Sequence, residues 1–276
     1  MTTHEIDKAK EMYIKGASLA EVGRALGHDA MTIKRNLIKN NIAIRSRSQQ
    51  NIISNMKRKK SVDDDYFNNI GINQAWLMGF IAADGTIRRE TNSIKITLSS
   101  IDREILEKIK KELKIERDIH DSLTSNGFNI SELSWTSKNH KDFLAQYNIV
   151  NNKTYLPMRV PKDFSRELTL AFILGYFDGD GSISINQEKY LRFRICAHRE
   201  EILKSIALSL KNIYNDISYS LSKDKRGLYE LSISSHYANQ IFEDMYNLNS
   251  MRLNRKYQKF LEYKKSHETT TSLKTR

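Results

Sequence analysis

The chain has 276 residues, of which 39% are hydrophobic and 28% charged, so it can bury a core and is neither a miniprotein nor a disordered polymer. Its 45 Lys and Arg against 33 Asp and Glu give a net charge of +12, which indicates a polyanionic partner such as nucleic acid. One cysteine excludes an internal disulfide, and short apolar runs exclude a membrane span, so we expect an intracellular, reducing setting.

Residues 1–45 are expected to form a helix-turn-helix module. Ser18 and Glu21 have the spacing of a capping box, and Asp29 can cap a third helix. This third helix is expected to turn three apolar residues inward: Ile33, Leu37 and Ile38. In a helix-turn-helix the last helix enters the major groove, so Lys34 and Arg35 are candidate DNA contacts.

Residues 46–65 are expected to be a basic linker. Between positions 45 and 60 the chain carries six cations and no acid: Arg45, Arg47, Lys57, Arg58, Lys59 and Lys60. One interpretation is a solvated tether. The other is an arm along DNA phosphates or in a minor groove, with Arg45 and Arg47 as candidate contacts.

An internal repeat is expected to fill residues 66–160 and 161–265, followed by a polar tail over 266–276. Residues 74–87 are echoed by residues 170–183, and Asp84 in the first copy corresponds to Asp180, 96 positions later. After each copy the apolar pattern predicts two strands, a helix, two more strands and a closing helix. The fold class is therefore α+β, with two pseudosymmetric units of helix–strand–strand–helix–strand–strand–helix order.

The first helix of each unit ends in small residues four positions apart, followed by Asp-Gly. Small residues at this spacing share a helix face and let two helices approach closely. The residues expected at this contact are Gly79, Ala83, Gly175 and Gly179. The glycines after the acids, Gly85 and Gly181, are expected to take the left-handed conformation that ends a helix.

Such a contact would bring Asp84 and Asp180 together at one end of the helix pair. Each carboxylate would face the negative end of a helix dipole and repel the other. A divalent cation bound by oxygen ligands would compensate, which favours Mg²⁺, with Mn²⁺ able to substitute, and phosphodiester hydrolysis. A single Asp-Gly pair can be a simple turn, but the duplication favours a shared metal site.

The segments Leu77–Gly85 and Ile173–Gly181 resemble the two signature motifs of single-chain LAGLIDADG homing endonucleases, over about residues 70–265. The resemblance implies that Asp84 and Asp180 are metal-binding catalytic acids and that the motif glycines form the repeat interface. A further acid of the family pattern is kept as Asp178 but replaced by Ala82 in the first copy.

The same resemblance implies a basic residue near each active centre, after the last helix of each repeat. Lys153 and Lys256 occupy such positions, and Arg255 is an alternative to Lys256. A lysine there could stabilise charge on the phosphate or help to deprotonate water.

The resemblance also implies that each half places an antiparallel sheet in the major groove. Alternation in the strands gives eight candidate base contacts: Lys95, Thr97, Ser134, Thr136, Arg192, Arg194, Glu230 and Ser232. An ordinary solvated sheet face would show the same alternation.

By this resemblance, the chain is expected to be a monomeric, Mg²⁺-dependent endonuclease that cuts both strands of double-stranded DNA across the minor groove of a long asymmetric target. Two alternatives remain open. One is a catalytically inactive LAGLIDADG transcriptional regulator, and the other is a maturase that binds intron RNA.

Overall fold

The computed structural model describes residues 1–58, 62–185, 190–234, 236–248 and 251–274. The chain divides into two compact units, Met1–Lys60 and Ser61–Arg276, and each is described by itself. Within the described residues, no helix has the length and apolar character needed to span a membrane. The helices of the first unit are α1 (Thr3–Ile14), α2 (Leu19–Leu26), α3 (Ala30–Lys39) and α4 (Arg47–Arg58).

Helices α1 to α3 pack around a small apolar core. The predicted caps are confirmed: Ser18 and Glu21 form a reciprocal capping box on α2, and the Asp29 carboxylate caps α3. The buried residues of this core are Ala9, Tyr13, Val22, Ile33 and Leu37. The expectation that Ile38 faces inward is wrong, since Ile38 is 54% exposed. One stripe of α3 covers the core, and Ile38 lies about 100° around the helix from Leu37.

Part of the segment interpreted as a linker is helical. Helix α4 begins at Arg47, and Ser46 and Gln49 exchange side-chain-to-backbone hydrogen bonds of 2.8 and 3.2 Å at its start. This reciprocal pair is a capping signal that the analysis of the sequence overlooked. Lys59 and Lys60 lie outside the described residues.

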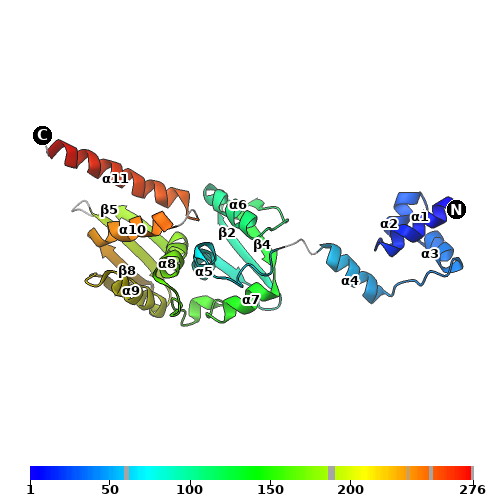
Figure 1. Ribbon diagram of the computed structural model, residues 1–276, viewed down its shortest axis with the longest axis horizontal. Helices are drawn as coiled ribbons and strands as arrows, with labels where there is room; N and C mark the ends of the chain where they lie inside the picture. The colour runs from blue at the N-terminus through cyan, green and yellow to red at the C-terminus, as the bar shows by residue number, and fades with distance from the viewer. Residues whose placement is uncertain (59–61, 186–189, 235, 249–250, 275–276) are drawn as a thin grey trace. The chain divides into compact units, whose positions relative to one another are not determined.

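The second unit contains the two predicted repeats (Figure 1). The first repeat comprises α5 (Ile72–Asp84), β1 (Gly85–Ile87), β2 (Ser93–Ser99), η1 (Ser100–Asp102), α6 (Arg103–Glu112), β3 (His120–Leu123), β4 (Asn129–Thr136), α7 (Lys138–Ala145) and η2 (Lys153–Tyr155). The second comprises α8 (Arg166–Asp180), β5 (Gly181–Ile185), β6 (Leu191–Ala197), α9 (Glu200–Tyr214), β7 (Ser220–Lys223), β8 (Tyr229–Ser234), α10 (His236–Leu248) and α11 (Asn254–Lys274). The α+β class and the order of elements in each repeat are confirmed. Helix α11 was not predicted, and it extends into the segment expected to be a polar tail.

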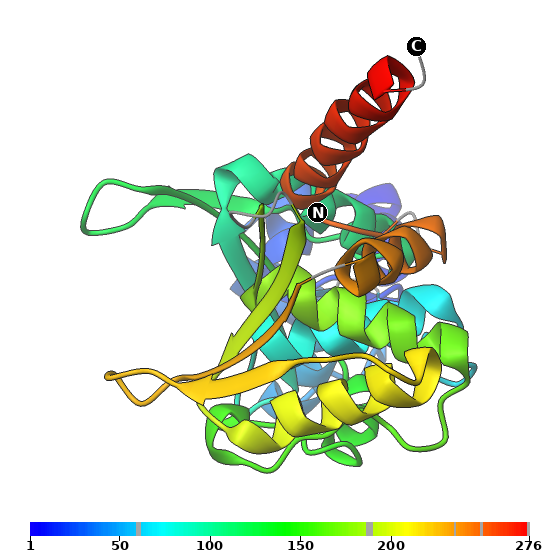
Figure 2. The same cartoon turned by 90° about the vertical axis from the view of Figure 1, so that its left-hand side faces the viewer.

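Each repeat forms a four-stranded antiparallel sheet, ordered β1-β2-β4-β3 in the first and β5-β6-β8-β7 in the second. Alternate residues of the central strands, such as Ile94 and Ile96 or Phe193 and Ile195, are buried against the helices. The intervening residues face the opposite side, which carries the polar positions. Figure 2 shows α8, α9 and α10 on one side of the second sheet.

Helices α5 and α8 pack along each other at the centre of the second unit (Figure 1). A Cβ added to Gly79 would lie 2.0 Å from the carbonyl oxygen of Phe172, and one added to Gly175 would lie 1.9 Å from that of Trp76. No side chain fits at these distances, so glycine sets the separation of the two helix backbones. Further along, a Cβ on Gly179 would lie 2.4 Å from the Cβ of Ala83.

The expectation of left-handed glycines after the acids is wrong. Gly85 has φ −72° and ψ 146°, and Gly181 has φ −94° and ψ 164°, so both are extended and begin strands β1 and β5. Glycine is required there for space. A Cβ on Gly85 would lie 2.6 Å from the Ile81 side chain, and one on Gly181 would lie 2.2 Å from Phe177.

Candidate active site and nucleic-acid interface

Asp84 and Asp180 end α5 and α8, and the close contact of these helices brings the two acids together. A Cβ on Gly179, next to Asp180, would lie 3.2 Å from the Oδ2 atom of Asp84. Burial raises the pKa of Asp84, and burial together with the Asp84 carboxylate raises the pKa of Asp180 to about 6. Each acid therefore resists ionisation, and the site gains stability from any cation that neutralises the pair.

Lys153 and Lys256 are both buried, 9% and 3% exposed. The Lys153 ammonium donates to the carbonyl oxygen of Gly85. The Lys256 ammonium donates to the carbonyls of Phe177, Asp178 and Gly181 at 2.6, 2.7 and 2.6 Å. Each lysine thus places a positive charge on carbonyl groups at the end of its own repeat's first helix, where the helix dipole is negative. Burial lowers the pKa of Lys153 and lowers that of Lys256 to about 8.

The charges of both lysines reach Asp84 and Asp180, and each of these acids is opposed most by the lysine of the other repeat. Burial raises the pKa of Asp84, and Lys256 is the cation that opposes this shift most. For Asp180, burial and Asp84 raise the pKa, and Lys153 is the most strongly opposing cation. A cavity of about 280 Å³ contains both Lys153 and Asp180 and is also lined by Tyr176, His198 and Arg199. The two acids and the two lysines therefore form one electrostatically coupled cluster, in which Lys256 also acts on Asp178.

Two further contacts make the halves unequal, and neither was predicted from the sequence. The Trp76 indole donates to the Oδ2 atom of Asp178 at 2.9 Å, across the repeat interface. Arg255 donates from Nε to both oxygens of Asp102 at 3.0 and 2.8 Å, which ties α11 to the first repeat. Arg255, the alternative to Lys256, is therefore engaged in an ion pair with Asp102.

Asp178 is fully buried. Burial raises its pKa to about 7, while the Lys256 ammonium and the Trp76 hydrogen bond oppose this shift. The corresponding position in the first repeat is Ala82, so the Trp76 hydrogen bond has no counterpart there. The second half thus carries an additional buried acid beside its lysine.

The candidate base contacts lie on the polar faces of the two sheets, and several are paired. In the first sheet, Lys95 forms a 2.9 Å ion pair with Glu132, and the Ser134 hydroxyl accepts from Arg117 at 2.8 Å. In the second sheet, Arg194 lies 3.4 Å from Glu230. The remaining predicted contacts occupy the same faces: Thr97, Thr136, Arg192 and Ser232.

Some donors on these faces are unused. The Oγ1 atom of Thr97 and the Nε atoms of Arg192 and Arg194 are buried without a hydrogen-bond partner. The strand register adds Thr86 beside Lys95 and Ser182 beside Arg194, two polar positions that the analysis of the sequence did not select. The second face carries Arg192 and Arg194 against Glu230, whereas Lys95 on the first face is balanced by Glu132, so the strands of the second face are the more basic.

The two repeats also match a family model. Residues 72–151 and 167–245 each match the LAGLIDADG-like domain. The chain belongs to the LAGLIDADG family. It contains two copies of the domain, preceded by the helices of the first unit.

Relatives of the chain include an uncharacterized protein of Methanocaldococcus jannaschii, 25% identical over 167 residues. The aligned part is 56% of each chain, so this protein spans about half the length of that relative. The LAGLIDADG homing endonuclease I-GzeII in complex with its DNA target has a TM-score of 0.47 and 14% identity, covering 75% of this chain and 92% of that one. Full-length DUF199/WhiA from Thermatoga maritima has a TM-score of 0.46 and 17% identity, covering 77% and 70%.

The carboxylate oxygens at this site would suit a hard divalent cation. Among the described residues there is no group of three or more His, Cys, Asp or Glu side chains that could hold a metal ion, so the protein offers the two carboxylates of Asp84 and Asp180. Mg²⁺ is commonly bound by one or two carboxylates, with waters and substrate phosphates as its other ligands. The donor set therefore fits Mg²⁺ at a shared site and does not fit a structural zinc.

The candidate DNA contacts of the first unit differ in their surroundings. Arg35 is exposed and Lys34 half-buried on α3, and a surface hollow on this helix is lined by Arg35 and Lys39 among others. Arg45 instead donates to the carbonyls of Tyr13 and Ala17 at 2.8 and 2.6 Å, and its guanidinium lies 3.9 Å from the centre of the Tyr13 ring. Arg45 therefore holds the chain after α3 against α1, while Arg47 is exposed at the start of α4.

Proposed function

We propose that this LAGLIDADG protein is a site-specific, divalent-metal-dependent endonuclease that hydrolyses both strands of double-stranded DNA. The observation that carries the proposal is the meeting of Asp84 and Asp180 at the ends of α5 and α8, within reach of the charges of two buried lysines. Both acids come from one chain, so a monomer has a complete site. Structural ion pairs also perturb pKa values, but they do not place two like charges together.

Asp84 and Asp180 would hold the cation, which when bound stabilises charge on the phosphate oxygens and makes a water more acidic. Mg²⁺ is the expected ion, and Mn²⁺ should substitute for it. Lys153 and Lys256 keep the ends of the two helices in place through carbonyl hydrogen bonds. Their ammonium groups also provide a positive field where negative charge grows as the phosphodiester is attacked.

The polar faces of the two sheets support recognition of an asymmetric target. The second face, with Arg192 and Arg194, is suited to guanine, because arginine can make a bidentate contact with its major-groove edge. On the first face Lys95 is neutralised by Glu132, so this half should depend more on neutral donors such as Thr97. Unequal faces in one chain remove the need for a palindromic site.

The first unit would extend the contact with DNA through α3. Lys34, Arg35 and Lys39 are cations of α3, and α2 and α3 have helix-turn-helix order. Arg45 is assigned to the stability of this unit, because its donors are used by backbone carbonyls.

The test of the proposed activity is incubation of the full chain with Mg²⁺ and a plasmid that carries the DNA flanking its own gene. We expect linear product with wild type, and none with Asp84→Asn or Asp180→Asn, although both variants should retain DNA binding in a gel-shift assay. Tight, specific binding by wild type without cleavage would instead support the transcriptional regulator.

The role of α3 is tested by Lys34→Glu combined with Arg35→Glu, with Lys8→Glu on α1 as the matched control. The double variant should shorten the DNase footprint and weaken binding, and reduce its dependence on salt. The control should behave as wild type. An unchanged footprint in the double variant would assign this unit to a protein partner.

A further inference from the structure

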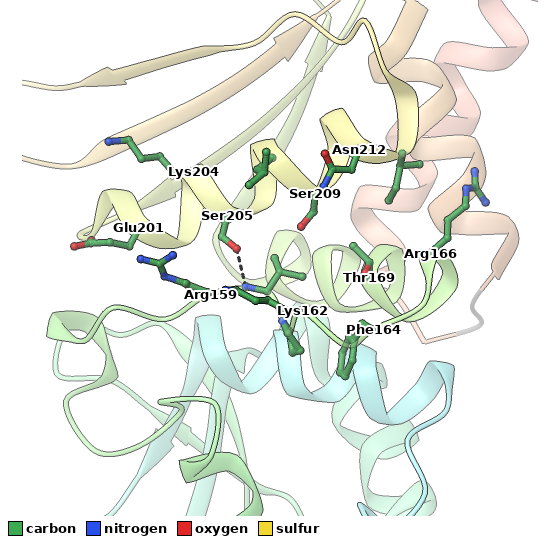
Figure 3. A pocket seen from close by; sticks show the side chains of 14 residues that line it. Arg159, Lys162, Phe164, Arg166, Thr169, Glu201, Lys204, Ser205, Ser209 and Asn212 are labelled. Carbon is green, nitrogen blue, oxygen red and sulfur yellow. Dashed lines mark hydrogen bonds between the residues drawn. The ribbon is translucent and has the colours of Figure 1, made fainter.

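A groove of about 590 Å³ lies on the helical side of the second repeat, between α9 and the segment that joins the repeats (Figure 3). Helices α8 and α9 pack on the sheet face opposite the polar face. None of the residues assigned above to DNA recognition or catalysis lines this groove. It is therefore a separate surface, and the proposed activity gives it no role.

The groove is elongated and preformed. One stripe of α9 lines it over successive turns, from Glu201 to Ile213, a span of about 18 Å at the helical rise. The facing wall is the segment from Arg159 to Arg166 and the start of α8. A 3.0 Å hydrogen bond from the Val160 amide to the Ser205 hydroxyl fixes this wall against α9 (Figure 3).

Cations predominate along the groove. Its lining includes four cations, Arg159, Lys162, Arg166 and Lys204, and one acid, Glu201. Figure 3 shows Arg159 and Lys204 near Glu201, and Arg166 toward the opposite end. Arg166 pairs with Asp244 and Lys204 with Glu200. Arg159 and Lys162 are both exposed, and the charge of Arg159 acts on Glu201, which also interacts with Arg199.

The middle of the groove combines apolar surface with hydrogen-bonding groups. Leu208 is 59% exposed there, and Phe164 also lines the groove. Thr169, Ser209 and Asn212 supply hydroxyl and amide groups along the same length. An apolar surface can contact the face of an unpaired base, while the polar groups can bond its edge or its sugar.

We infer that this groove binds a short segment of single-stranded nucleic acid, with phosphates at Arg159 and Lys162 and unpaired bases along Leu208. The groove has the volume of a ligand pocket, so it can hold a single strand but not a duplex. An acidic peptide would satisfy the cations but would bring no flat base to the exposed leucine.

The test is fluorescence anisotropy of the full chain with labelled oligouridine RNA and oligothymidine DNA, each of about 12 nucleotides. The charge variant is Arg159→Glu combined with Lys162→Glu. Its matched control is Lys211→Glu, an exposed lysine of α9 that does not line the groove. A second variant, Leu208→Gln, removes the exposed apolar surface proposed to contact the bases without changing the charge of the groove. A polyglutamate peptide is the competitor.

The charge variant should weaken binding of at least one oligonucleotide by about tenfold or more, and Leu208→Gln should weaken it as well, while Lys211→Glu leaves it within about twofold. The oligonucleotide that binds more tightly, RNA or DNA, shows whether the groove prefers ribose or deoxyribose. Duplex binding and cleavage should be unchanged in all three variants, so a failure of the proposed endonuclease function is seen separately. Equal affinity in the charge variant and its control, no effect of Leu208→Gln, or displacement by polyglutamate as effective as by unlabelled oligonucleotide would overturn the inference.

Discussion

Replacing Asp180 by Asn should stabilise the second unit while abolishing cleavage. Burial and the Asp84 carboxylate raise the pKa of Asp180 from 3.8 to about 6, and a shift of this size corresponds to a ceiling of about 3 kcal/mol against the ionised form. Asp180 keeps contact with solvent at the end of α8, although neighbouring groups crowd its carboxyl. Solvent therefore screens the repulsion, and we expect Asp180→Asn to raise the free energy of unfolding by about 1 kcal/mol near neutral pH.

The pH dependence follows from the sign of the shift. Between the unfolded and folded pKa values the native state binds more protons, so wild type loses stability as the pH rises from about 4 to about 6. The advantage of Asp180→Asn should therefore be fully present above about pH 6 and should disappear as the pH falls toward 4. A metal chelator is needed, because a bound cation would relieve the same repulsion.

Urea unfolding followed by tryptophan fluorescence measures this directly. The chain has two tryptophans, Trp76 and Trp135, and both lie in the second unit, so the first unit does not contribute. Asp102→Asn is the matched control with the opposite sign, because Asp102 is ion-paired with Arg255 and its loss should destabilise the unit. Destabilisation by Asp180→Asn above pH 6, or an advantage independent of pH, would refute the reasoning.

Three further predictions concern the helix contact, the first unit and the lysines. Gly175→Ala should lower the free energy of unfolding by about 3 kcal/mol or more, because its Cβ would lie 1.9 Å from a backbone oxygen. The control Gly127→Ala, in an open left-handed turn, should lower it by only about 1 kcal/mol. Equal losses in urea unfolding would contradict this prediction. Arg45→Ala should reduce hydrogen-exchange protection of α1 and α3. Unchanged protection would mean that Arg45 does not stabilise this unit and is available to contact DNA. Cleavage should decline above about pH 8 as the Lys256 ammonium loses its proton, and residual cleavage by Lys256→Met should lack that decline.

Features set by local spacing were predicted from the sequence. The capping residues Ser18 and Asp29, the duplicated motif and the order of elements in each repeat all depend on neighbours within a few residues. The placement of Asp84 and Asp180 at helix ends follows from the same local pattern, because an apolar helix followed by Asp-Gly recurs 96 residues later.

Features that depend on distant partners were missed. Trp76 meets Asp178 across 102 positions, and Arg255 meets Asp102 across 153, and no local spacing signals either pair. The conformation of Gly85 was mispredicted because glycine is needed there to leave room for the Ile81 side chain, and not to allow a left-handed backbone. The groove along α9 depends on how the segment joining the repeats folds back, which periodicity does not specify.

The central claim is that Asp84 and Asp180 hold the same divalent cations, and Mn²⁺ titration followed by electron paramagnetic resonance tests it most directly. The protein is bound to a non-hydrolysable duplex, and wild type is compared with Asp84→Asn, Asp180→Asn and the double variant. Each single variant should lose tight Mn²⁺ binding as fully as the double variant does. Retention of wild-type affinity by either single variant, or losses that add as they would for two independent sites, would contradict a shared site.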